Sequence, residues 1–134
     1  MSDNHKNAIA FVCSDGRLHH GEVNLCEKIR TLLEVDFVYI IAVPGPDGVL
    51  KKDSSAWCKT AREEFELLNE AKHPIKVAIV GHCDCAGHPV SDEEHEKDVA
   101  GCVETIKSWG FGGEILGLLA EHNSDTNWPM KKVL

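Results

Sequence analysis

The residues of this chain best suited to chemistry lie in two short motifs. Cys13, Asp15 and Arg17 lie in the run CSDGR, and His82 and Cys85 lie in the run GHCDC. Two thiolates and one imidazole are a typical set of three protein ligands for zinc, and such a set leaves the fourth position open to water. The residue types therefore indicate a catalytic zinc site more than a structural one.

Asp15 and Arg17 are candidates to assist a water molecule bound to that zinc. Two thiolates cancel the formal charge of the ion, so its bound water is expected to be a weaker acid than water held by three neutral imidazoles. Arg17 can hold one carboxylate oxygen of Asp15 and fix its orientation. Asp15 can then accept a hydrogen bond from the bound water. A solvated ion pair with no catalytic role is the alternative for these two residues taken alone.

Each motif directly follows an apolar run that is typical of a buried strand. A further run at residues 37–43 is almost continuously apolar, as expected for a parallel sheet that is covered on both faces. The strands predicted in this way span residues 8–13, 37–43, 75–80 and 115–120, with a further edge segment at 128–133.

Apolar residues at helical spacing predict helices between these strands, over residues 22–33, over 54–71 and from Ser91 onwards. On the second helix, Trp57 and Phe65 are expected to be buried. Ser91 with Glu94 forms a capping box for the third helix. The run PGPDG at residues 44–48 predicts a loop.

Alternating strands and helices predict an α/β fold, a short and mostly parallel β-sheet flanked by helices. In such sheets, ligands bind beyond the carboxyl ends of the strands. Cys13 and His82 both lie at or just past predicted carboxyl ends, so the fold brings two distant segments to one rim. Residues 1–134 are expected to form one domain.

Composition excludes several classes of partner. The chain has 134 residues and a formal net charge of −8, which argues against nucleic acid or an anionic membrane as partner. No apolar run approaches the roughly 18 residues of a transmembrane helix, and the polar N-terminal run MSDNHKN does not resemble a signal peptide. We therefore expect a cytoplasmic location, where the six cysteines stay reduced.

The two motifs together resemble the signature of the β-class carbonic anhydrases. That family carries Cys-x-Asp-x-Arg followed about seventy residues later by His-x-x-Cys, and the segments AIAFVCSDGR, FVYIIAVPGPDG and VAIVGHCDCAG are similar to its sequences as well. The likeness spans about residues 9–87. The chain departs from the family at Ala42-Val43-Pro44-Gly45, where Arg-Asn-Ala-Gly is usual, and at Ala86, where glycine usually follows the last zinc ligand.

The resemblance implies a β-carbonic anhydrase-like fold and a zinc enzyme that hydrates carbon dioxide to bicarbonate and a proton. Cys13, His82 and Cys85 would be the ligands of the Zn²⁺, and Asp15 with Arg17 would form a dyad beside the metal-bound water. In some family members this aspartate itself takes the fourth position on zinc. Asp15 therefore either assists the metal-bound water or blocks that position. The family also implies a homodimer or a higher homo-oligomer.

Two other functions are open for this chain. One is a zinc hydrolase on the same scaffold that acts on carbon disulfide or carbonyl sulfide. The other is a non-catalytic zinc-binding interaction module. Direct assays with each substrate separate these functions from carbon dioxide hydration.

Several other polar residues near the motifs are expected to have plain structural roles. Cys83 is interpreted as a packed thiol, and the acidic run at residues 92–96 as the solvated first turn of a helix. His19, His20 and His88 are interpreted as surface histidines, although each lies near enough to a motif to carry protons.

Overall fold

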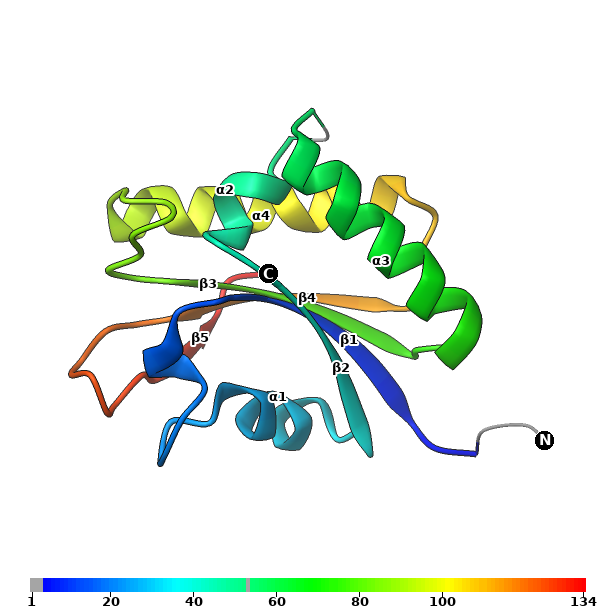
Figure 1. Ribbon diagram of the computed structural model, residues 1–134, viewed down its shortest axis with the longest axis horizontal. Coiled ribbons are helices and arrows are strands. Elements are labelled where there is room, and N and C mark those ends of the chain that lie inside the picture. Colours follow the sequence, from blue (N-terminus) through cyan, green and yellow to red (C-terminus); the bar gives the residue numbers. More distant parts are fainter. Residues whose placement is uncertain (1–3, 53) are drawn as a thin grey trace.

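A single five-stranded sheet organises the chain in the computed structural model, which describes residues 4–52 and 54–134. The first residues of the polar N-terminal run, 1–3, and residue 53 lie outside the described part. The strand order is β2-β1-β3-β4-β5 (Figure 1). The strands are β1 (Asn7–Cys13), β2 (Phe37–Val43), β3 (Lys76–His82), β4 (Glu114–Ala120) and β5 (Met130–Lys132).

The first four strands run parallel, and β5 pairs antiparallel with β4. Strand β1 pairs with β2 from Asn7 to Cys13, and on its other side it pairs with β3. Because β1 and β3 are parallel neighbours, their carboxyl ends lie at the same edge of the sheet. Cys13 ends β1 and His82 ends β3, so the sheet brings the two motifs together.

Helices cover both faces of the sheet, which confirms the predicted α/β fold. The helices are α1 (Leu25–Leu33), α2 (Pro46–Leu50), α3 (Ala56–Lys72) and α4 (Asp92–Ser108); η1 (Gly16–Leu18) is a single 3-10 turn. Figure 1 shows α1 on one face of the sheet and α2, α3 and α4 on the other. Two separate apolar cores result, one on each side of the sheet.

Strand β2 differs from the expectation drawn from its apolar sequence. It lies at the edge of the sheet, and only Ile41 and Val43 in it are buried. Phe37 is 48% exposed and Ile40 is 38% exposed. The apolar run therefore predicted the strand correctly, but within this chain it is not covered on both faces.

Two local predictions near the second helix were wrong. Residues 46–48, the last three of the expected loop, belong to the short helix α2 (Pro46–Leu50), because Pro46 at the start of the helix has a φ angle suited to a helix start. Trp57 is 56% exposed. The buried face of α3 carries Cys58, Ala61 and Phe65, and Trp57 lies about 100° around the helix from Cys58.

The third predicted helix begins as expected. The Ser91 side chain accepts a hydrogen bond from the backbone N–H of Glu94, which caps α4. Within residues 4–52 and 54–134, no helix combines the length and the apolar character needed to cross a bilayer.

Candidate metal centre

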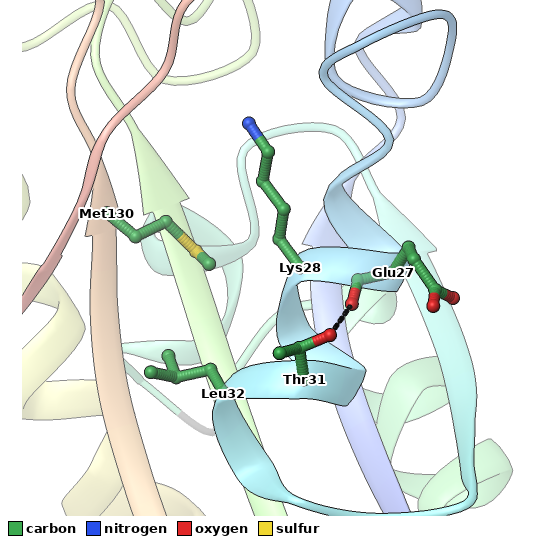
Figure 2. A pocket seen from close by; sticks show the side chains of 5 residues that line it. All are labelled: Glu27, Lys28, Thr31, Leu32 and Met130. Carbon is green, nitrogen blue, oxygen red and sulfur yellow. Dashed lines mark hydrogen bonds between the residues drawn. The ribbon is translucent and has the colours of Figure 1, made fainter.

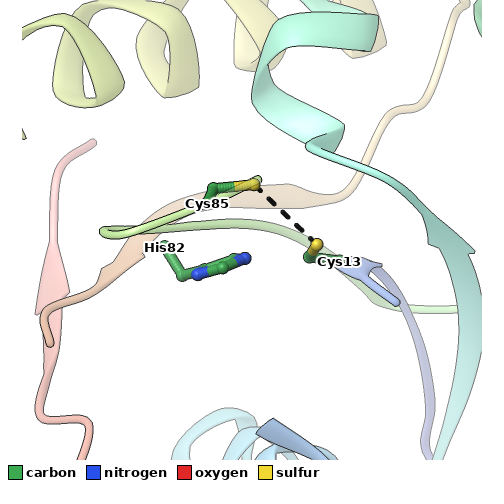
Figure 3. Close-up of side chains that lie close together, drawn as sticks. All are labelled: Cys13, His82 and Cys85. Atoms are coloured by element: carbon green, nitrogen blue, oxygen red, sulfur yellow. Dashed lines mark hydrogen bonds between the residues drawn. The ribbon is translucent and has the colours of Figure 1, made fainter. Parts of the chain in front are cut away.

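Cys13, His82 and Cys85 converge at the carboxyl edge of the sheet. One ligand-type atom from each residue lies within 4.8 Å of those of the other two, and all three residues are buried. The Sγ atoms of Cys13 and Cys85 are 3.9 Å apart. In Figure 3, the ring of His82 extends toward Cys13, and Cys85 comes from the turn that follows β3. Residues 72 positions apart thus form one cluster.

The cluster fits a tetrahedral zinc ion. With Zn–S bonds of about 2.3 Å, two thiolates on such an ion lie about 3.8 Å apart, close to the observed 3.9 Å. His82 Nδ1 lies 2.8 Å from the carbonyl oxygen of Cys83. Because a carbonyl only accepts, Nδ1 carries the proton and Nε2 holds the free lone pair. Nε2 is buried and has no hydrogen-bond partner, as expected for a nitrogen prepared to bind a metal.

The short distance between the two thiols couples their pKa values. The hydrogen bond from Cys85 lowers the pKa of Cys13, against the effect of burial, and the Gly45 N–H lowers it further. The hydrogen bond to Cys13 and burial raise the pKa of Cys85. These opposite shifts favour the ionised form of Cys13 and the protonated form of Cys85. A divalent cation would replace the proton of Cys85 and hold both sulfurs as thiolates.

Asp15 and Arg17 form a close pair beside this cluster. Arg17 Nη2 lies 2.7 Å from Asp15 Oδ2, and its Nε lies 3.2 Å from both carboxylate oxygens. The backbone N–H of Arg17 also donates to Asp15 Oδ1 at 2.9 Å. These hydrogen bonds to Arg17 lower the pKa of Asp15, so its carboxylate stays ionised at neutral pH.

Arg17 contacts three further residues that the sequence did not predict as its partners. Its Nη1 lies 3.0 Å from Asp84 Oδ2 and 3.1 Å from Asp125 Oδ1, and its Cζ lies 5.0 Å from the centre of the Trp128 ring. A planar guanidinium suits such a combination of carboxylates and an aromatic face. These partners lie 67 and 108 or more residues from Arg17, so sequence spacing carried no signal for them.

A small cavity opens beside the cluster. Its volume is about 190 Å³, and it is lined by Cys13, Ser14, Asp15, Pro44, Ala86 and Gly87. Cys13, one of the candidate metal ligands, and Asp15 therefore line the same space. The rest of its lining is small or apolar, so the cavity admits a small neutral molecule without strong polar anchors.

Glycines let two loops meet behind Cys13. The Gly45 N–H donates to Cys13 Sγ at 3.5 Å, and Gly45 has a positive φ of 59°, a conformation that favours glycine. A Cβ on Gly87 would lie 2.9 Å from the backbone nitrogen of Gly45 and 2.9 Å from the carbonyl carbon of Pro44. The close approach of the two loops therefore requires glycine at position 87. The residue directly after Cys85 is Ala86.

Replacing Gly87 with alanine is expected to weaken the centre. The added methyl group would press on backbone atoms of residues 44 and 45, and such overpacking typically costs about 1–3 kcal/mol. Chemical denaturation measures the loss in unfolding free energy. Gly112→Ala is the matched control, because a Cβ there meets nothing within 4 Å. Equal stability of the two variants would contradict the close contact between the loops.

The other cysteine and the histidines near the motifs have different surroundings. Cys83 is buried, as predicted, and burial raises its pKa to about 12, so it stays a protonated thiol. His20 is exposed as expected. His19 and His88 differ from the prediction: His19 Nε2 donates to the Cys13 carbonyl at 2.6 Å, and His88 Nε2 lies 2.6 Å from Asp98 Oδ2.

An apolar groove of about 380 Å³ lies apart from the metal centre, between α1 and β5 (Figure 2). The hydrogen bond that Figure 2 draws among the lining residues runs from Thr31 Oγ1 to the backbone carbonyl of Glu27, within α1. None of its lining residues is a cysteine or histidine, so we assign no chemistry to it. The groove is lined by Glu27, Lys28, Thr31, Leu32 and Met130.

Comparison with known proteins identifies the family of this chain. Residues 3–133 match the sequence family described as "Putative carbonic anhydrase". The chain therefore belongs to this carbonic anhydrase family, and the resemblance drawn from its motifs is confirmed. A search of curated proteins gives no significant match.

Solved structures of β-carbonic anhydrases share the fold. One is the β-carbonic anhydrase CafA of the fungal pathogen Aspergillus fumigatus, with a TM-score of 0.52, 14% sequence identity, and coverage of 96% of this chain and 75% of that one. Another belongs to the tetrameric β-carbonic anhydrases from the filamentous ascomycete Sordaria macrospora, with a TM-score of 0.59, 11% identity, and coverage of 95% and 80%. At these identities the likeness concerns the fold, and it makes this chain a divergent member.

Proposed function

We propose that this protein is a zinc-dependent carbonic anhydrase that catalyses the reversible hydration of carbon dioxide to bicarbonate and a proton. The observation that carries the proposal is the cluster of Cys13, His82 and Cys85, with ligand-type atoms within 4.8 Å of one another. Membership of the carbonic anhydrase family supports the same reaction.

In this proposal, Cys13 and Cys85 bind the ion as thiolates and His82 binds it through Nε2. The ion would supply the Lewis acidity that makes water a nucleophile near neutral pH. The carbonyl of Cys83 accepts the Nδ1 proton of His82, which fixes the tautomer and the ring orientation. The Gly45 N–H, at 3.5 Å from Cys13 Sγ, favours the thiolate form of that ligand.

Asp15 orients the reacting water through a hydrogen bond that its carboxylate accepts. Arg17 makes this role effective in two ways, because it keeps the carboxylate ionised and fixes both of its oxygens. Since both oxygens are engaged by Arg17, we propose that Asp15 assists the metal-bound water and does not block the fourth position on the zinc. Asp84 and Asp125 in turn hold the guanidinium in place.

The cavity suits a small, neutral substrate. Carbon dioxide has no charge and no hydrogen-bond donor, so it needs space and an apolar wall more than polar anchors. Pro44, Ala86 and Gly87 supply such a wall in a space of about 190 Å³ that Asp15 also lines.

Proton release after mixing zinc-loaded protein with carbon dioxide tests the proposal. We expect a rate that is well above the buffer rate and proportional to protein concentration, followed in a stopped-flow instrument with a pH indicator. The zinc-free protein is the control. A rate equal to that of buffer, with zinc bound, would favour a non-catalytic zinc-binding module. Turnover of carbonyl sulfide or carbon disulfide alone would favour the hydrolase.

We further propose that the chain is a single domain that assembles as a homo-oligomer and acts in the cytoplasm. The exposed apolar residues Phe37 and Ile40 on the edge strand β2 support self-association, because an uncovered edge strand invites pairing. The Sordaria macrospora enzymes are tetrameric. A native mass above the 14.8 kDa of one chain would support this assembly.

A further inference from the structure

Trp128 contacts both parts of the candidate site. It precedes β5 in the hairpin that joins β4 to β5, and it is only 1% exposed. Strand β4 lies beside β3, with Ala120 opposite His82, so the returning arm of this hairpin carries Trp128 to the carboxyl edge of the sheet. The ring belongs to the same apolar core as Cys13 and Cys85.

The Trp128 ring packs against His82, the histidine of the candidate metal centre. The two ring centroids are 5.6 Å apart and the ring planes meet at 75°, an edge-to-face arrangement that aromatic rings favour. The imidazole is also held at Nδ1, which lies 2.8 Å from the carbonyl oxygen of Cys83. A hydrogen bond and the contact with Trp128 therefore both restrict the orientation of the ring that carries the unpartnered Nε2.

The same indole contacts Arg17, which holds the carboxylate of Asp15. Arg17 Cζ lies 5.0 Å from the centre of the indole, within the range of a cation–π interaction. The indole Nε1 donates to the backbone carbonyl of Asp125 at 3.2 Å, and the carboxylate of Asp125 lies 3.1 Å from Arg17 Nη1. Trp128 therefore holds the guanidinium both directly and through Asp125.

We propose that Trp128 is a positioning residue that fixes His82 and Arg17 relative to each other. The inference rests on the proposed function, which assigns His82 to the zinc and Asp15 to the reacting water. Arg17 passes the constraint on, because its Nη2 lies 2.7 Å from Asp15 Oδ2. Trp128 lies outside the lining of the 190 Å³ cavity, so it acts through these residues and not on the substrate.

Zinc affinity of the full-length protein tests the contact with His82. In competition with a chelator, we expect Trp128→Leu to bind Zn²⁺ about 10- to 100-fold more weakly than the native protein, the usual cost of losing a residue that supports a metal ligand. Phe65→Leu is the matched control. Phe65 is also 1% exposed, but it belongs to the core on the other face of the sheet, so this variant should lose stability and keep the native zinc affinity. Equal zinc affinities of the two variants would overturn the proposal.

Trp128→Phe is the conservative variant. Phenylalanine keeps an aromatic face for Arg17 and His82, but it is smaller and lacks the Nε1–H group. We expect its zinc affinity to lie between those of the native protein and Trp128→Leu. Should Trp128→Leu fail to fold, Trp128→Phe decides alone, and an unchanged zinc affinity in it would overturn the proposal.

A double substitution tests the contact with Arg17. At saturating zinc, Trp128→Leu should lower kcat/KM for carbon dioxide about 10-fold or more. It should lower kcat/KM by a smaller factor in the Asp15→Asn protein, because the effects of residues that act through one another are not additive. The same factor in both proteins would overturn the proposal, since Trp128 would then not act through Arg17 and Asp15. A native protein that binds zinc without hydrating carbon dioxide would refute the proposed function alone, and the zinc affinities would still decide the role of Trp128.

Discussion

Replacing Cys85 with serine is expected to abolish carbon dioxide hydration and to remove one zinc ion per chain. Serine cannot supply a thiolate, so the metal centre would keep only Cys13 and His82 as ligands, too few for a stable site. Because metal binding is coupled to folding, the variant should also unfold at a lower temperature than the zinc-loaded native protein. Zinc analysis, the proton-release assay and thermal unfolding measure the three effects.

Cys83→Ser is the matched control for this variant. Cys83 lies two residues from Cys85 and is also buried, but it does not belong to the cluster with Cys13 and His82. It should therefore keep its zinc and most of its activity. If Cys85→Ser kept the zinc content and the rate of the native protein, Cys85 would not be a ligand.

Replacing Asp15 with asparagine is expected to lower kcat/KM for carbon dioxide by about 10- to 100-fold near neutral pH, the usual cost of losing a residue that supports a metal site. Asparagine has nearly the same shape but no charge, so it accepts a hydrogen bond from water less strongly. The zinc content should not change. Stopped-flow rates across a range of pH measure the effect.

The pH dependence of the proposed activity is a second test of the role of Asp15. Since hydrogen bonds from Arg17 lower the pKa of Asp15, the ionised carboxylate persists to lower pH than for a free aspartate, and its contribution is lost only as the pH falls through this lowered value. Asp125→Asn is the control: Asp125 also pairs with Arg17, but its side chain is 68% exposed, against 18% for Asp15. Equal losses in both variants would contradict a special role for Asp15.

The sequence predicted the strands and the clustering of Cys13, His82 and Cys85 because both signals are local. The apolar run of β2 has the predicted bounds, 37–43. Each ligand motif follows directly on a strand, so the rule for parallel sheets was enough to bring Cys13 and His82 to one edge. What the sequence did not predict is the network around Arg17, since Asp84 and Asp125 reach it only through the tertiary fold.

The helical spacing of His95 indicated that its side chain is buried, but the acidic residues around it indicated a solvated turn. His95 lies in the acidic run at residues 92–96, which indicated a solvated helical turn. It also lies four and seven positions before Val99 and Cys102, on the apolar face of the same helix. Its partner Asp47 is 48 residues away, in a run that resembles a turn. No spacing rule connects the two.

Strand β2 and Trp57 show that an apolar residue in the sequence is not always buried in the fold. A continuous apolar run predicts a strand, but it does not say whether a helix or another chain covers each side. Phe37, Ile40 and Trp57 are all exposed in this chain, and a partner subunit is the physical explanation that we propose for the first two. For Trp57, the helical period places its neighbour Cys58 in the core instead.

A crystal structure of the zinc-loaded protein, with anomalous diffraction measured at the zinc absorption edge, tests the central claim most directly. We expect an anomalous peak about 2.3 Å from the Sγ atoms of Cys13 and Cys85 and about 2.0–2.1 Å from His82 Nε2, with Asp15 still bound to Arg17. Absence of a peak between these three atoms, or a disulfide between the two sulfurs in its place, would contradict the assignment of this site as the catalytic metal centre.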